Sequence, residues 1–119
     1  MDRIEKIRYT HDMNTTSTHN EIVALLAANQ PLFQALGDMA RQEIIVILAG
    51  EDRLTVGELA RRTHLSRPAV SHHLKILKDA GLLHEVREGV RRYYQPSFAG
   101  AIASMESLVA KISTVKELL

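Results

Sequence analysis

A mostly α-helical fold with one small β-hairpin, in the α+β class, is what the 119-residue sequence predicts. Three observations lead to this fold class. Apolar residues recur at helical spacing through most of the chain, and capping residues precede several of these stretches. Two short β-favouring segments flank a glycine at position 89. A last apolar stripe then runs at alternating spacings of four and three residues.

The N-terminal part divides into an arm and a helix. Residues 1–17 show no sustained periodicity, and we expect them to form a flexible N-terminal arm or a frayed extension of the first helix. The remaining residues, 18–119, are expected to form one domain. Its first helix is expected from about Thr18 to Asn29, with one face formed by Ile22, Leu25, Leu26 and Asn29.

Two further helices are expected before residue 51. Pro31 favours the start of a short helical turn that ends near Gly37. Asp38 can then cap a helix that ends at Gly50. Because residues 44–48 are all apolar, this helix is predicted to be buried on every side.

A pair of capped helices follows. Thr55 and Glu58 have the spacing of a capping box, which predicts a short helix ending near residue 62. Ser66 can cap a second helix, in whose first turn Pro68 is tolerated because those N–H groups lack helical partners. Gly81 ends this helix, and its buried stripe is predicted to comprise Val70, Leu74 and Leu77.

A hairpin and a final helix complete the chain. The strands are expected over residues 82–86 and 90–94, joined by a three-residue loop at 87–89. A helix beginning near Ser97 carries a 3.5-residue apolar period, which predicts packing along a partner helix through Phe98, Ile102, Met105, Val109 and Ile112. The expected order is four or five helices, depending on whether the short turn after Pro31 is counted, then a hairpin and a long last helix. Written ααααββα, this is the order of a winged helix-turn-helix.

The charge distribution is that of a protein with an anionic partner on one face, or of a solvated charged surface, and the helix-turn-helix pattern indicates that the partner is DNA. Although the chain carries a net charge of only +1, residues 61–95 contain eight Lys or Arg and three acidic residues, a net charge of +5. If the stripe of the second helix faces inward, its opposite face is free to enter a major groove. The predicted DNA-binding residues are Ser66, Arg67, Pro68, Ser71, His72 and Lys75 on this helix, with Arg87, Arg91 and Arg92 on the hairpin.

Individual roles follow from side-chain chemistry. Base choice is expected to come mainly from Arg67, Ser71 and His72. Arg61 and Arg62 either contact phosphate or solvate the preceding helix. His73 is expected to pack or to form a hydrogen bond within the domain.

The sequence resembles the ArsR/SmtB family of bacterial repressors. The resemblance is carried by SRPAVSHHLKILKDAGLL at residues 66–83, by TVGELA at 55–60, and by LGD at 36–38. It covers residues 32–95 and extends more weakly into the last helix. The resemblance implies a homodimer formed by the first and last helices, an inverted-repeat operator, and release by an inducer. The predicted interface therefore combines the stripe of the last helix with Ile22, Leu25 and Leu26.

The chain departs from this family at its known sensing sites. It contains no cysteine, and residues 98–119 contain neither His nor Asp, so the thiolate and zinc ligand sets are missing. We predict no bound metal or cofactor and leave the inducer unidentified. Adjacent side chains on a helix point about 100° apart, which disfavours a shared ion at His72 and His73. Whether His11, Asp12 and His19 bind a metal stays open.

Other function classes find little support. The sequence has no Gly-rich phosphate loop, and Ser71 beside His72 is not a catalytic triad, so we do not expect an enzyme. No apolar run is long enough to cross a membrane, and the polar start is unlike a signal peptide. Together with the absence of cysteine, this predicts a cytoplasmic protein. The alternative is a winged helix that serves as a protein-interaction or architectural module without an operator.

Overall fold

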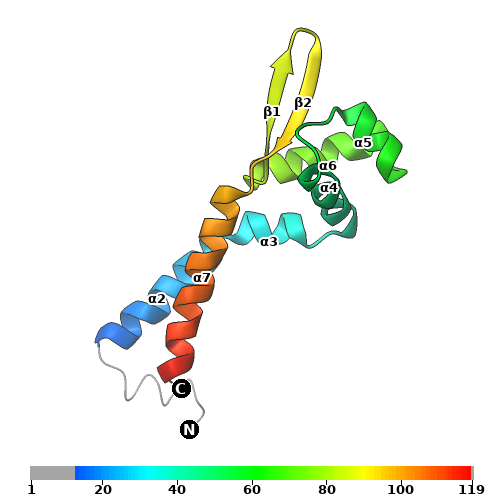
Figure 1. The fold of residues 1–119 in the computed structure, drawn as a ribbon. Coiled ribbons are helices and arrows are strands. Elements are labelled where there is room, and N and C mark those ends of the chain that lie inside the picture. The colour runs from blue at the N-terminus through cyan, green and yellow to red at the C-terminus, as the bar shows by residue number, and fades with distance from the viewer. Residues whose placement is uncertain (1–12, 119) are drawn as a thin grey trace. The chain divides into compact units, whose positions relative to one another are not determined.

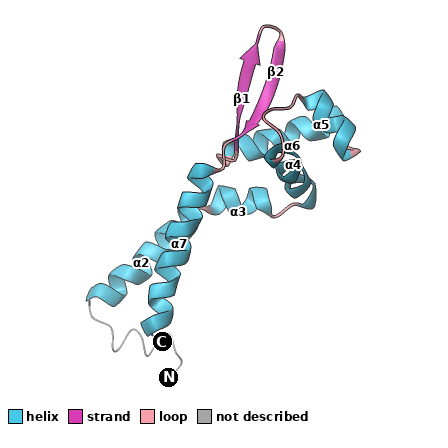
Figure 2. Cartoon of the chain, in the orientation of Figure 1, coloured by secondary structure: helices cyan, strands magenta, loops and turns pink. Residues whose placement is uncertain are grey.

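The computed structural model describes the backbone of residues 13–118 and the side chains of residues 17–115. Figures 1 and 2 show mostly helices with one two-stranded antiparallel hairpin, so the predicted fold class is confirmed. The elements in chain order are α2 (Met13–Ala28), α3 (Gln30–Leu36), α4 (Met39–Ala49), α5 (Val56–Thr63), α6 (Arg67–Asp79), β1 (Leu83–Glu88), β2 (Arg91–Pro96) and α7 (Ala99–Leu118).

The chain divides into two compact units. Residues 31–101 form one unit, which contains α4, α5, α6 and the hairpin and is called here the winged unit. Residues 1–30 and 102–119 form the other, called here the helical unit, which contains α2 and most of α7. Within the winged unit, the hairpin projects beyond the helices (Figure 2).

One apolar cluster fills the winged unit. The predicted stripe of α6 is confirmed, because Val70, Leu74 and Leu77 are each 0% exposed. They pack with buried side chains from every other element of this unit, and the rest of the cluster is Leu32, Ala35, Ile44, Leu48, Leu54, Leu59, Leu82, Leu83 and Tyr94. This shared core sets the positions of α5, α6 and the hairpin relative to one another.

The predicted helix caps are present. Asp38 Oδ1 accepts a hydrogen bond from the Arg41 backbone N–H at 3.1 Å, which caps α4. Thr55 and Glu58 form both hydrogen bonds of the capping box at the start of α5. Ser66 Oγ accepts from the N–H of the third residue of α6, and Gly81 follows that helix with φ of +79°.

The expected start of the first helix near Thr18 is wrong, because the helix begins at Met13 and residues 13–17 therefore extend it, as one of the two alternatives for this segment had it. The Ser and Thr residues there reduce helix stability by only a few tenths of a kcal/mol each. Residues 1–12 of the expected arm lie outside the described residues. Burial of α4 on every side is also wrong, since Val46 is 72% exposed. The neighbours α5, α6 and β2 cannot cover the whole circumference of α4.

The expected three-residue hairpin loop is wrong as well. Glu88 pairs with Arg91, so Gly89 and Val90 form a two-residue turn in which the glycine has φ of +62°. A two-residue turn with glycine first matches the twist of the flanking strands. Arg87 therefore lies within β1, opposite Arg92, and not at the tip where it was expected.

In the helical unit, α7 presents one side to α2. Ser104 Oγ donates a hydrogen bond to Asn29 Oδ1 at 2.8 Å, and Lys111 forms an ion pair with Glu21 at 2.5 Å. Leu108, between these two positions on α7, is buried. Another face of α7, which carries Ile102, Val109 and Ile112, is not covered by the described residues.

Candidate nucleic-acid interface

The outer face of α6 presents the side chains that the sequence predicted. Since the buried stripe turns one side of the helix inward, the opposite side faces solvent. All six predicted residues are exposed, namely Ser66, Arg67, Pro68, Ser71, His72 and Lys75. This arrangement gives the helix a polar, basic surface with donors and acceptors suited to base edges and phosphates.

Two of these side chains also have roles within α6. The Ser66 hydroxyl oxygen accepts the capping hydrogen bond from Ala69 at 3.2 Å. Lys75 lies 3.4 Å from Asp79, one helical turn away, and both side chains are well exposed. An exposed pair of this kind contributes little to stability, so Lys75 can exchange Asp79 for another anion at small cost.

His73 bonds within the winged unit, as expected. Its Nδ1 lies 3.2 Å from Nη1 of Arg41, and because a guanidinium can only donate, Nδ1 accepts and the ring proton is on Nε2. Arg41 also donates to the carbonyl oxygens of Ala35 and Gln34, at 2.9 and 3.1 Å. Arg41 thus joins the end of α3 to α6. The neighbouring His72, unlike His73, is exposed to solvent.

Residues that sequence analysis missed hold the hairpin at two levels, within β2 and next to the turn. Leu54 exchanges two backbone hydrogen bonds with Tyr94, at 3.0 and 2.8 Å. Arg53 lies 4.0 Å above the ring of Tyr93 and pairs with Glu88 at 2.7 Å. Arg53 and Glu88 are 35 positions apart, so no local pattern could indicate their contact.

The hairpin cations differ in their partners. Glu85 pairs with Arg92 at 2.5 Å and lies 3.9 Å from Arg87 and 3.3 Å from Lys78. Arg91 has no such carboxylate partner among the described residues. Of the three arginines predicted to bind DNA on the hairpin, two are thus partly neutralised by Glu85.

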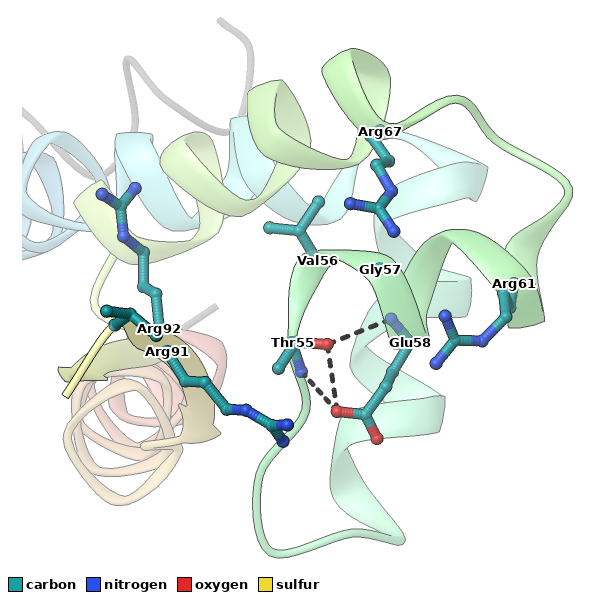
Figure 3. Close-up of a pocket in the computed structure, with 9 residues that line it drawn as sticks. Thr55, Val56, Gly57, Glu58, Arg61, Arg67, Arg91 and Arg92 are labelled. Carbon is teal, nitrogen blue, oxygen red and sulfur yellow. Dashed lines mark hydrogen bonds between the residues drawn. The ribbon is translucent and has the colours of Figure 1, made fainter. Parts of the chain in front are cut away.

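A hollow with a basic lining lies between α5, the start of α6 and the hairpin; it is called here the basic hollow (Figure 3). Arg91 extends toward Thr55 and Glu58, whereas Arg92 extends the opposite way (Figure 3). The lining residues are Thr55, Val56, Gly57, Glu58, Arg61, Arg67, Val90, Arg91 and Arg92.

Glu58 is the one acidic residue of this lining. The backbone N–H and the hydroxyl of Thr55 both donate to the Glu58 carboxylate. These hydrogen bonds, the backbone one most, lower the pKa of Glu58, and the charges of Arg61 and Arg62 lower it further by a smaller amount. Arg62 itself points elsewhere and pairs with Glu51 at 2.7 Å. The two neighbouring arginines, for which phosphate contact and solvation were both considered, therefore differ: Arg61 lines the hollow, whereas Arg62 forms a surface ion pair.

The uncovered face of α7 carries the predicted partner stripe. Its four members in the helical unit are substantially exposed: Ile102 52%, Met105 38%, Val109 60% and Ile112 45%. Three of them border a shallow groove along α7. On α2, Leu26 is exposed, Ile22 and Leu25 are half-buried, and Val23 is an exposed apolar residue that the sequence analysis missed. Phe98 instead packs against the core of the winged unit.

The described residues contain neither a cluster of metal ligands nor a membrane-spanning helix. Among the described residues, no three His, Asp or Glu side chains cluster as metal ligands would. His19 is exposed on α2, whereas His11 and Asp12 lie outside the described residues. Over residues 13–118, no helix is both long and apolar enough to cross a membrane.

The paired helices α5 and α6, with the hairpin after them, define a winged helix-turn-helix protein. Comparison with known proteins identifies its family. The model of the "bacterial regulatory protein, arsR family" matches residues 38–85. The transcriptional repressor SdpR of Bacillus subtilis is 40% identical over 63 residues, which cover 53% of this chain and 69% of that protein. The chain therefore belongs to the arsR family and is a DNA-binding transcriptional regulator.

Two further similarities extend the comparison. The HTH-type transcriptional regulator Rv2034 of Mycobacterium tuberculosis is 49% identical over 71 residues, which cover 60% of this chain and 65% of that protein. The solution structure of the homodimeric winged helix-turn-helix DNA-binding domain of Mb0332 from Mycobacterium bovis superposes with a TM-score of 0.60. It is 29% identical, and the match covers 77% of this chain and 83% of that one. Families of this kind regulate transcription and are not a class of enzymes.

Proposed function

We propose that this protein is a homodimeric transcriptional repressor that binds an inverted-repeat operator and releases it in response to an unidentified inducer. The observation that carries the proposal is the polar, basic outer face of α6 beside a hairpin that the core holds in place. The relative SdpR, named a transcriptional repressor, supports the direction of regulation. The neighbour Mb0332, named as homodimeric, supports the assembly. Because its target is the chromosome, we place the protein in the cytoplasm.

Binding to DNA would use α6 and the hairpin together. The helix enters the major groove, where Ser71 and His72 lie on its outer face and can bond to base edges. Lys75 and the arginines of the hairpin provide contacts to phosphate, which supply much of the affinity and make it fall steeply with salt. The tip of the hairpin, with Arg91 beside it, approaches the flanking backbone or minor groove.

The dimer places two such surfaces on one operator. A two-fold axis relates the two copies of α6, so the half-sites of the operator form an inverted repeat about one helical turn apart, roughly 34–36 Å. The exposed stripe of α7 is the surface that we assign to the dimer contact, because an apolar face of this length is unfavourable in water. Phe98 is left out of this contact, since it packs within its own unit.

The test is selection of bound fragments from genomic DNA by the purified protein, with binding repeated at two salt concentrations. The proposal predicts one shared inverted repeat whose affinity falls with salt. A double variant, Ser71→Ala with His72→Ala, should bind the repeat no better than other DNA, while its thermal unfolding remains that of the wild type because both side chains are exposed.

Other outcomes would change the assignment. Fragments without a common repeat would indicate an architectural protein that binds DNA regardless of sequence. No binding to DNA at either salt concentration would indicate a protein-interaction module. Once a repeat is found, the genes beside it define which compounds to try as inducers, and expression from that promoter should rise when the gene for this protein is deleted.

A further inference from the structure

The basic hollow carries more positive charge than its surroundings neutralise. Four arginines line it, of which Arg92 is paired with Glu85, whereas Arg61, Arg67 and Arg91 share the hollow with a single lining carboxylate, that of Glu58. That carboxylate is already engaged by the capping box at the start of α5. No ion pair joins any of the three arginines to an acidic residue among the described residues. Three cations around one occupied carboxylate attract a further anion into the hollow.

Arg67 lies at the junction between α5 and α6. It is the first residue of α6, and its guanidinium lies over Gly57 of α5 (Figure 3). A Cβ atom built on Gly57 would be 2.9 Å from Nη2 and 3.3 Å from Cζ of Arg67. Glycine at this position therefore provides the space that the guanidinium occupies.

We propose that the basic hollow binds a backbone phosphate of DNA through Arg67, and that Gly57 keeps the hollow open for this arginine. This inference rests on the proposed function and replaces one part of the sequence-based expectation, in which Arg67 selects bases. The guanidinium lies back over α5, whereas Ser71 and His72 occupy the outer face of α6 that would enter the groove.

A phosphate group fits the chemistry of the hollow. It presents several acceptor oxygens in an arrangement that guanidinium groups recognise with paired hydrogen bonds. Arg61, on α5, and Arg91, on the hairpin, approach from the other sides of the hollow. A phosphate held there would fix α6 at one depth and angle in the groove, which is the positioning role that backbone contacts have in protein–DNA complexes.

The test compares variants on two DNA duplexes: a synthetic duplex of scrambled sequence and the best fragment from the genomic selection. If Arg67 binds phosphate, Arg67→Ala weakens binding to both duplexes by a similar factor, on the order of tenfold. The slope of log K against log salt concentration becomes shallower by about 0.9, because one fewer counterion is released. Arg67→Lys keeps the charge and should retain most of that slope.

Gly57→Ala tests the second part of the proposal. The new methyl group displaces the end of a flexible side chain and not the backbone, so the variant should fold and melt like the wild type. It should nevertheless lose affinity for both duplexes, in the direction of Arg67→Ala. Gly100→Ala is the matched control, since a Cβ there meets no atom within 4 Å, and it should bind DNA as the wild type does.

Three results would overturn the inference. Loss of affinity for the selected fragment alone, with an unchanged salt slope, would make Arg67 a base-reading residue. Wild-type binding by Gly57→Ala would remove the role of Gly57. Saturable heat from titration with inorganic phosphate alone, absent in Arg67→Ala, would assign the hollow to a small free anion. A wild-type protein that binds neither duplex would contradict the proposed function itself and is therefore distinguishable from these results.

Discussion

The substitution Val109→Asp tests whether the exposed stripe of α7 is the dimer contact. Val109 is 60% exposed in the single chain, the largest value among the four stripe residues of the helical unit. Burying a whole valine side chain is worth roughly 1.5–3 kcal/mol, so covering the exposed part is worth about 1–2 kcal/mol per protomer. A two-fold contact contains the residue twice, which makes about 2–4 kcal/mol for the dimer.

This free energy sets the size of the expected effect. Loss of about 2–4 kcal/mol corresponds to a dimer dissociation constant about 30-fold to almost 1,000-fold higher. The aspartate adds the unfavourable burial of a charge in each protomer, so these figures are a lower bound. The measurement is sedimentation equilibrium over a range of protein concentrations, in which the variant should be monomeric where the wild type is dimeric.

Val46→Asp is the matched control. Val46 is also a valine on a helix, is 72% exposed, and lies on α4 in the other compact unit. The same change of helix propensity is made at both positions, so any difference between the variants reports on the contact and not on the helix. The reasoning is refuted if Val109→Asp stays dimeric at every concentration, or if Val46→Asp dissociates the dimer equally.

Three further predictions follow from the winged unit. Thr55→Ala removes the capping box and should lower the free energy of unfolding by about 0.5–2 kcal/mol in urea, whereas Thr55→Ser should keep most of it. Because the folded state lowers the pKa of Glu58, the ionised carboxylate contributes to the free energy of unfolding above the unfolded pKa of about 4.3, and this contribution is lost as the pH falls through the folded pKa. Glu58→Gln should therefore flatten that part of a curve of unfolding free energy against pH. Leu74→Ala leaves a cavity at a fully buried core position and should lower the free energy of unfolding by about 2–5 kcal/mol. A decrease below about 1 kcal/mol would contradict the placement of Leu74 in the core.

The features that sequence analysis predicted well depend on residues close together in the chain. A capping residue and the N–H that it accepts from are three positions apart, as in Thr55 and Glu58, so the cap can be read from composition and spacing alone. The same holds for the buried stripe of α6, because a helix places residues four and three positions apart on one side. Together with the turn residues, these local signals determined the order of elements and hence the fold class.

The features that sequence analysis missed depend on contacts between distant segments. The two-residue hairpin turn follows from the register of the two strands. Arg53, which lies outside the hairpin, supports this register through its ion pair with Glu88 and its contact with the ring of Tyr93. The exposure of Val46 depends on which neighbours pack around α4, which its own apolar run cannot reveal.

By itself, then, the sequence determined the elements, their caps, the inward stripe of α6 and the basic character of its outer face. The tertiary structure decided which basic side chains are free. It places Glu85 among Arg87, Arg92 and Lys78, and it brings Arg67, over Gly57, to the same hollow as Arg91. The physical reason is that charge is a property of a residue, whereas its neutralisation depends on which other charges the folded chain brings within a few ångströms.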